Sequence, residues 1–188
     1  MPAYHILKIK SITPSSIGAS SFVLILESNH STNLSFPIVI GNQEAQCISI
    51  ILEGISIKRP LTHDLFVNLF SLINVTLEFV EITKFNDGVF FAELNLVNDD
   101  KHIVLDARPS DAIALAIRLN KEIRIPSALF DSICIDSSEI SESGSISDVE
   151  IVVSLSDLES ELKKALADEN YEVAASLRDK IEQLNAKK

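Results

Sequence analysis

Apolar and polar residues along the first part of the chain follow spacings that are typical of regular secondary structure. Alternation with a period of two indicates half-buried strands, and apolar residues three or four positions apart indicate helices. Short β-rich runs between turn-rich segments, with clear alternation at residues 75–85, predict strands at residues 4–13, 20–28, 33–40, 75–85, 89–97, 102–107 and 122–125. Helical spacing and helix-start signals predict helices at residues 43–54, 62–73, 112–120 and 126–133. Pro37 favours an edge position or a bulge for its strand.

The pattern changes after about residue 134. Residues 136–148 are rich in Ser and acidic residues and carry no apolar period, which predicts a flexible linker. Residues 155–188 then show two apolar helical stripes with a break between them. Two short helices bury such stripes poorly by themselves, so we expect this hairpin to need a partner surface or a second copy.

Two helix starts share an unusual corner, "RPLTHD" at residues 59–64 and "RPSD" at residues 108–111. Each corner has Arg-Pro, then a hydroxyl residue, then an Asp. Capping explains much of this pattern, because Thr62 and Ser110 suit the N-cap position. Asp64 and Asp111 would then lie in the first turn, where the helix dipole favours negative charge.

The same corners also carry groups suited to binding phosphate. Helix N-termini present free N–H groups to anions, and Arg59 and Arg108 could add paired contacts to the same anion. Ser110 lies in the same corner as Arg108. We therefore predict substrate binding by Arg59 and Ser110, and a catalytic role for Arg108.

Acidic residues and a histidine complete the candidate site. His63 suits general acid–base catalysis, and Asp64 and Asp111 are the other catalytic candidates. Asp106 and Asp111 could hold a divalent cation, Mg²⁺ or Mn²⁺, through oxygen ligands. Such an ion would activate water and stabilise a phosphoryl transition state.

Charge and cysteine content narrow the possible functions. The net charge of −11 argues against tight, non-specific nucleic-acid binding, which depends on many cationic contacts. Cys47 and Cys134 lie far apart in apolar surroundings, so they predict neither a disulfide nor a zinc site. Without a signal-like N-terminus or a long apolar run, we expect a cytoplasmic protein with no membrane contact.

Four blocks of the sequence resemble the bifunctional nuclease domain family, in the family's order. They are "FPIVIGNQEAQCISIILEG", "RPLTHDLFVNLF", "DGVFFAELNL" and "DARPSDAIALAIRLNKEI". The tail "LESELKKALADENYEVAASLRDKIEQL" resembles a UVR motif, a helical hairpin of nucleotide-excision repair subunits. The resemblance implies a nuclease-like domain at residues 1–134, a linker at 135–153 and a UVR-like hairpin at 154–188.

The resemblance also implies a fold and an activity. The expected fold is α+β: a compact, mixed and mainly antiparallel sheet or small barrel with packed helices, followed by the α-helical hairpin. The expected activity is that of a DNase or RNase, in a domain that self-associates into a homo-oligomer. Its blocks point to six site residues: His63, Asp64, Asp106, Arg108, Ser110 and Asp111. Gly41, Glu44 and Glu53 in the first block are interpreted as structural. The UVR-like tail implies a contact between residues 155–188 and a protein partner.

Two hypotheses follow. In the first, the chain is a metal-assisted nuclease that acts on DNA or RNA at the two corners. In the second, the corners only cap helices, and the chain is a non-catalytic adaptor that self-associates and docks a partner through its tail. The spatial arrangement of Asp64, Asp106 and Asp111 separates the two hypotheses, since only a site needs them to converge.

Overall fold

The computed structural model describes residues 4–15, 21–29, 31–86 and 88–136, and four single helical residues in the tail, Leu162, Ala175, Arg178 and Ile181. An eight-stranded sheet runs through the described part in the order β6-β5-β4-β7-β1-β2-β3-β8. Its strands are β1 (Tyr4–Pro14), β2 (Ser21–Ser28), β3 (Ser31–Gly41), β4 (Val75–Asn86), β5 (Val89–Asn98), β6 (Lys101–Ala107), β7 (Glu122–Pro126) and β8 (Ile135–Asp136). The helices are α1 (Asn42–Leu52), α2 (Thr62–Leu72), α3 (Pro109–Leu119) and α4 (Ser127–Ile133).

Two antiparallel meanders make up most of the sheet. The strands β1, β2 and β3 form one, and β4, β5 and β6 form the other. The chain then passes from the edge strand β6 through α3 and inserts β7 between the meanders, parallel to β4 and antiparallel to β1. With β6 and β8 at opposite ends, the described sheet is open, so the expected sheet is confirmed in its open form rather than as a closed barrel.

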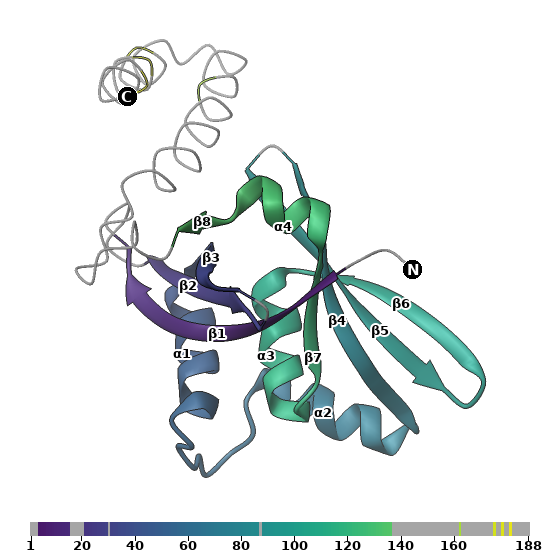
Figure 1. Ribbon diagram of the computed structural model, residues 1–188. Coiled ribbons are helices and arrows are strands. Elements are labelled where there is room, and N and C mark those ends of the chain that lie inside the picture. The colour runs from purple at the N-terminus through teal and green to yellow at the C-terminus, as the bar shows by residue number, and fades with distance from the viewer. Residues whose placement is uncertain are drawn as a thin grey trace.

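The helices α1, α2 and α3 lie together on one side of the sheet, with α3 in the middle (Figure 1). Residues 112–116 of α3 are almost fully buried, because this helix packs against both neighbouring helices and against β4, β5 and β7. Three of the five are Ala, and their small side chains allow close approach. The position of the two Arg-Pro corners follows from this packing, since α2 and α3 begin there.

Buried side chains alternate along β4 and β5, as the sequence pattern predicted for residues 75–85. In β5, Ala92, Leu94 and Leu96 face the helices and are buried, and they pack with Val80 and Ile82 of β4. The mainly antiparallel sheet with its separate helices confirms the fold class as α+β.

None of the helices in the described part of the chain is long and apolar enough to cross a membrane.

The capping prediction was wrong in its residues. Thr62 and Ser110 are helical residues inside α2 and α3, and the N-cap positions belong to Leu61 and Arg108. Neither hydroxyl is needed as a cap, because Asp64 accepts a hydrogen bond from the Leu61 amide in α2 and Pro109 opens α3.

The segment after the sheet differs from the expected linker at its start. Ile135 and Asp136 form β8, which pairs with Ser35 and Leu34 of β3. Pro37 lies beyond this short pairing, where β3 pairs only with β2 among the described residues, in agreement with the predicted edge position. The remaining linker and nearly all of the predicted hairpin lie outside the described residues.

Candidate functional site

The corner at the start of α3 places a guanidinium and a carboxylate side by side. Arg108 is the N-cap residue with extended backbone, and Pro109 fixes the first helical position. Asp111 follows in the first turn, and its Oδ2 accepts a hydrogen bond of 2.8 Å from Nε of Arg108. Its Oδ1 lies 3.3 Å from the NH2 nitrogen of the same side chain. The pair is thus held in the forked geometry that an Arg and a carboxylate favour.

The second corner meets the first through His63. Its Nε2 lies 3.2 Å from Oδ1 of Asp111, 48 positions away in the sequence. An ionised carboxylate only accepts hydrogen bonds, so Nε2 carries a hydrogen atom and donates a hydrogen bond to Asp111. The His63 side chain is 12% exposed, and its Nδ1 is buried without a partner in the described part of the chain. His63 therefore supports Asp111 from the interior side.

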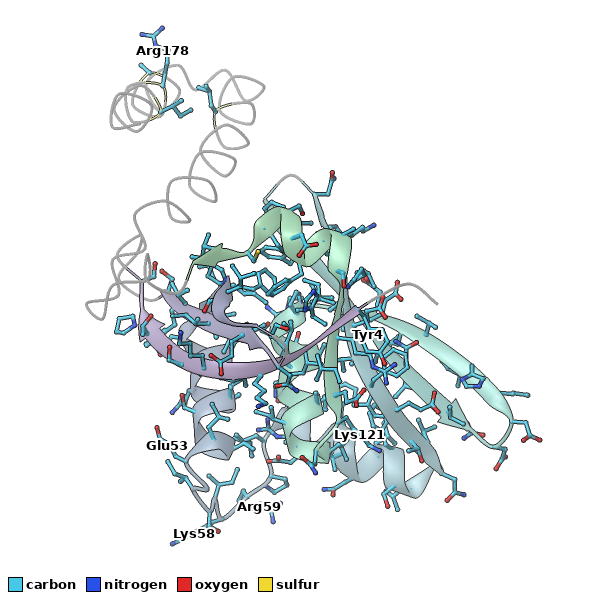
Figure 2. All side chains as sticks on the ribbon, in the orientation of Figure 1. Tyr4, Glu53, Lys58, Arg59, Lys121 and Arg178 are labelled. Carbon is cyan, nitrogen blue, oxygen red and sulfur yellow. The ribbon has the colours of Figure 1, made fainter. Side chains whose placement is uncertain are left out.

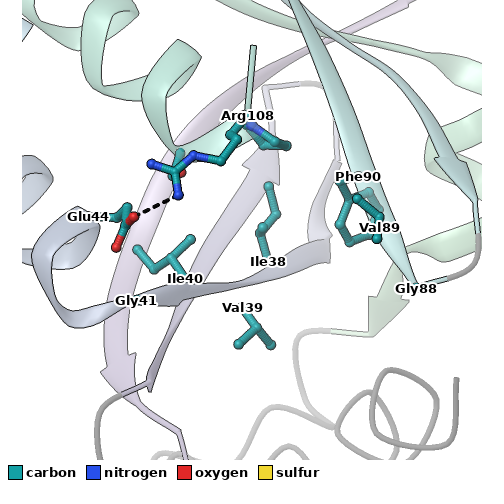
Figure 3. Close-up of a pocket in the computed structure, with 11 residues that line it drawn as sticks. Ile38, Val39, Ile40, Gly41, Glu44, Gly88, Val89, Phe90 and Arg108 are labelled. Carbon is teal, nitrogen blue, oxygen red and sulfur yellow. Dashed lines mark ion pairs between the residues drawn. The ribbon is translucent and has the colours of Figure 1, made fainter. Parts of the chain in front are cut away.

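A third element, α1, contributes Glu44. Its Oε1 lies 2.9 Å from the NH1 nitrogen of Arg108 (Figure 3). The guanidinium therefore lies between two carboxylates, those of Glu44 and Asp111. The Glu44 side chain folds back onto Gly41 at the start of α1, and a side chain at Gly41 would collide with its carboxylate. Glu44, Arg108, Asp111 and His63, hereafter the Arg108 cluster, join α1, α2 and α3.

A separate ion pair lies beside this cluster. Nε of Arg118 donates to Oδ1 of Asp64 at 2.8 Å, and Arg118 also donates to the carbonyl groups of Ala114 and Cys47. The Arg118 side chain is 3% exposed, so the charge is buried, and each of its three nitrogens donates one of these hydrogen bonds. Asp64 also receives the Leu61 amide hydrogen bond. Arg118 therefore fixes the relative positions of the three helices.

Positive neighbours control the pKa values of both aspartates. Burial by itself would raise the pKa of Asp111, but hydrogen bonds and positive charge from Arg108 and His63 outweigh it and lower that pKa below its ordinary value. In the same way, Arg118 and the Leu61 amide overcome the effect of burial on Asp64 and lower its pKa. Both carboxylates are therefore ionised at neutral pH.

A cavity of about 310 Å³ opens beside the Arg108 cluster. Arg108, Pro109 and Ser110 form one wall, and Glu44 lies at the same end. Apolar residues form most of the remaining lining: Ile38, Val39 and Ile40 of β3, and Val89 and Phe90 of β5 (Figure 3). The cavity therefore combines a charged rim with an apolar interior.

Two of the residues predicted from the sequence lie away from this cluster. Asp106 is exposed on β6 opposite Glu93, and its neighbours Leu105 and Ala107 face the helix side, so Asp106 points to the other face of the sheet. Arg59 is exposed in the loop between α1 and α2 (Figure 2). The structure brings together His63, Arg108 and Asp111. Ser110 lines the cavity next to Arg108, and Asp64 contacts Arg118 rather than the cluster.

The predicted metal pair does not form one site. Asp106 points away from the helix side of the sheet, where Asp111 lies on α3, and both oxygens of Asp111 contact Arg108 or His63. No three His, Cys, Asp or Glu side chains within the described ranges gather closely enough to hold a metal ion. The pair thus does not fit a bound cation in this arrangement.

Sequence reasoning missed two members of this region. Glu44 was interpreted as structural, and its partner Arg108 lies in another block of the sequence, so no local pattern joins the two. Arg118 was overlooked altogether, although Asp111, Ala114, Leu115 and Arg118 lie on one face of a helix and Arg118 interrupts an apolar run. A charged residue on such a face is a usable signal for a buried ion pair.

The fold and cluster define an α+β domain with a charged site at a helix N-terminus. The family model of the bifunctional nuclease domain matches residues 24–138, so the chain belongs to the bifunctional nuclease domain family. The model of the UvrB/uvrC motif matches residues 153–187. Both resemblances noted in the sequence are confirmed.

Individual relatives support this assignment. The chain is 36% identical over 107 residues to an uncharacterized protein of Mycobacterium tuberculosis, in an alignment that covers 57% of this chain and 62% of that protein. It is 27% identical over 184 residues to bifunctional nuclease 2 of Arabidopsis thaliana, which covers 88% of this chain and 56% of the plant protein. The chain thus spans less than two thirds of the length of these relatives.

Proposed function

We propose that the chain hydrolyses phosphodiester bonds of DNA or RNA, with the Arg108 cluster as the reaction centre. The carrying observation is the Arg108 guanidinium, held between Glu44 and Asp111 at the rim of an apolar cavity. The plant relatives that carry the name bifunctional nuclease support the same activity.

Arg108 is suited to hold the phosphate. A guanidinium has five N–H donors, and contacts to Glu44 and Asp111 use three of them. One donor therefore remains on each terminal nitrogen for phosphate oxygens. The side chain is 66% exposed, so a substrate can reach these donors.

The carboxylates of Asp111 and Glu44 are the groups that would orient and deprotonate a water molecule near that phosphate. Both carboxylates contact the Arg108 guanidinium, and Asp111 is ionised because its pKa is lowered. The buried His63 serves as a positioning residue for Asp111, since its outward nitrogen is already committed to that carboxylate. This differs from the proton-transfer role expected for His63 from the sequence.

The apolar cavity suits the base of one nucleotide. Its volume of about 310 Å³ lies at the lower end of the range for small-ligand sites. A base in a duplex is stacked and paired, so it enters such a cavity only after leaving the helix. We therefore expect a preference for single-stranded substrates.

A divalent cation, Mg²⁺ or Mn²⁺, remains part of the proposal. Its support is the local charge: Glu44 and Asp111 outnumber Arg108, and this excess of negative charge opposes the approach of a phosphate. A bound cation would supply charge neutralisation there. No step above depends on it, because the predicted Asp106 and Asp111 pair does not fit a cation in this structure.

The direct test is cleavage of single-stranded DNA and RNA oligonucleotides by the full chain, with Mg²⁺ or Mn²⁺ and with EDTA. Asp111→Asn should lower the cleavage rate by a factor of about 100 or more, as expected for a group that takes part in proton transfer. Asp131→Asn is the matched control, since Asp131 is exposed on α4. Equal cleavage by Asp111→Asn and the parent would exclude the cluster, and unchanged cleavage in EDTA would exclude the cation.

The UvrB/uvrC motif favours a second candidate function, that of an adaptor. In this alternative the chain self-associates in the cytoplasm as a homo-oligomer, and residues 155–188 dock a protein partner. Pull-down with the full chain and with the chain ending at residue 154 compares the two sets of bound proteins. An identical set after truncation would contradict a docking tail.

A further inference from the structure

The strand β6 forms one end of the sheet, where it pairs only with β5 among the described residues. Figure 1 shows the β5–β6 hairpin extending from the side of the molecule that is far from β8. Residues 101–106 are all exposed. An edge strand of this kind presents unpaired N–H and C=O groups, which are a template for another strand.

The centre of β6 is apolar on both faces. Ile103 and Leu105 lie opposite Leu96 and Leu94, so they point to the helix side of the sheet, yet each remains exposed. Val104 points to the other face and is 58% exposed. Soluble proteins usually protect an edge strand with charged residues, Pro or a bulge. Here three consecutive apolar residues are left open to solvent.

The neighbouring helix α2 exposes apolar residues as well. The amide group of Asn98, at the end of β5, donates to the carbonyl of Ile73, so the C-terminal end of α2 lies beside the strand that pairs with β6. The exposed large apolar residues in and directly after α2 are Leu65, Phe66, Leu69, Leu72 and Ile73. A concentration of exposed apolar area on one side of a protein marks an interaction surface.

We propose that β6 pairs antiparallel with β6 of a second copy of this chain, around a two-fold axis at Val104. In this register Val104 faces Val104 of the other copy, and Ile103 faces Leu105 twice. His102 faces Asp106 twice on the opposite face, and only the outermost pair, Lys101 with Ala107, sets a charged residue against an apolar one. The partner is a second copy because the strand is complementary to itself about its centre, as a two-fold interface requires.

The charges around Asp106 agree with this register. Within one copy Asp106 lies opposite Glu93, and like charges in that arrangement are unfavourable. Glu93 in turn faces Glu81, whose pKa is raised by burial and by the charge of Glu93. His102 of the other copy would give Asp106 a hydrogen-bond donor. His102 lies 3.6 Å from Glu78 in its own chain, and the His102 side chain is 76% exposed, so another chain can reach it.

Other registers lack this agreement. Centring the pairing on Ile103 places His102 against Val104 and Lys101 against Leu105. Centring it on Leu105 places Val104 against Asp106. Either shift puts a polar side chain against an apolar one directly beside the axis. The register at Val104 does so only at the ends of the pairing, where Lys101 faces Ala107, and is therefore the one that β6 favours.

Sedimentation of the full chain over a range of concentrations tests the association. The parent should form a dimer, and Val104→Lys should raise its dissociation constant about tenfold or more, because two ammonium groups would meet at the axis. Ile55→Lys is the matched control, since Ile55 is 49% exposed in the loop after α1. A parent that stays monomeric, or a dimer that Val104→Lys leaves intact, would overturn the proposal.

Cross-linking tests the register without depending on a charged substitution. Residues opposite each other at such an axis are close enough for a disulfide, so oxidised Val104→Cys should form a covalent dimer and Ile55→Cys should not. His102→Asp should weaken the dimer, and the added change Asp106→His should restore it. Absence of the covalent dimer, or no restoration, would overturn this register. Both experiments measure the mass of the dimer, so their outcome does not depend on whether the chain has nuclease activity.

Discussion

The guanidinium of Arg118 and the carboxylate of Asp64 join α3 to α2 across 54 positions of sequence, with 2.8 Å between Nε and Oδ1. The same guanidinium reaches the Cys47 carbonyl of α1. Since Glu44, His63 and Asp111 come from these same three helices, the Arg118 contacts hold the elements that build the Arg108 cluster. The stability of the fold and the geometry of the site therefore share one buried residue.

Replacing Arg118 by Met should lower the free energy of unfolding by about 3 kcal/mol, because Asp64 and two carbonyl groups lose their donor in a buried place. Urea unfolding measures this change. In a double-mutant cycle with Asp64→Asn, the two changes should cost less together than the sum of their separate costs. Additive costs would show that the pair is not coupled.

Acid should remove the contribution of Asp111 to stability. Its pKa is lowered in the folded chain, so this contribution is complete above the ordinary aspartate value of 3.8 and is lost as the pH falls through the lower folded value. The parent should be more stable than Asp111→Asn at neutral pH, and the difference should shrink below about pH 4. Urea unfolding at several pH values checks this, and a constant difference would contradict it.

Glu81 should show the opposite dependence. Burial, followed by the charge of Glu93, raises its pKa, so the folded chain favours the protonated form. The favourable contribution is complete below the ordinary glutamate value and is lost as the pH rises through the raised folded value. Glu81→Gln should therefore be more stable than the parent at neutral pH and gain little in acid. A variant that is less stable than the parent at neutral pH would refute this account.

The variant Gly41→Ala distinguishes an effect on the site from an effect on the stability of the fold. The added methyl group would collide with the flexible end of Glu44 and displace its carboxylate from Arg108. Stability should change by about 1 kcal/mol or less, as for an exchange at a helix N-cap. The rate of nucleic-acid cleavage should fall, because the Glu44 carboxylate is displaced from Arg108. Assays of Gly41→Ala and the parent under identical conditions measure this fall. Parent-like cleavage would show that the position of Glu44 is unimportant.

The strands and helices were largely predictable, because their apolar spacing depends on local sequence. Burial of Ala92, Leu94 and Leu96 on one face of β5 follows directly from alternation. The pairing of β7 between β4 and β1 was not predictable in this way. It depends on how α3 carries the chain back from the sheet edge, which no local pattern records.

The candidate site was predictable only in part for the same reason. The two Arg-Pro corners were visible, and the contact of His63 with Asp111 brings them together. Glu44 joined them only once α1 had packed beside α3. Asp106 was separated from Asp111 by the alternation of β6, which places it on the opposite face of the sheet.

Cleavage of a single-stranded oligonucleotide by Arg108→Gln is the most direct test of the central claim, that the Arg108 cluster hydrolyses phosphodiester bonds. Arg178→Gln is the matched control, because Arg178 is exposed and lies outside the nuclease domain match. We predict that kcat/KM falls about 100-fold or more for Arg108→Gln and is unchanged for Arg178→Gln. Equal values for Arg108→Gln and the parent would contradict the claim.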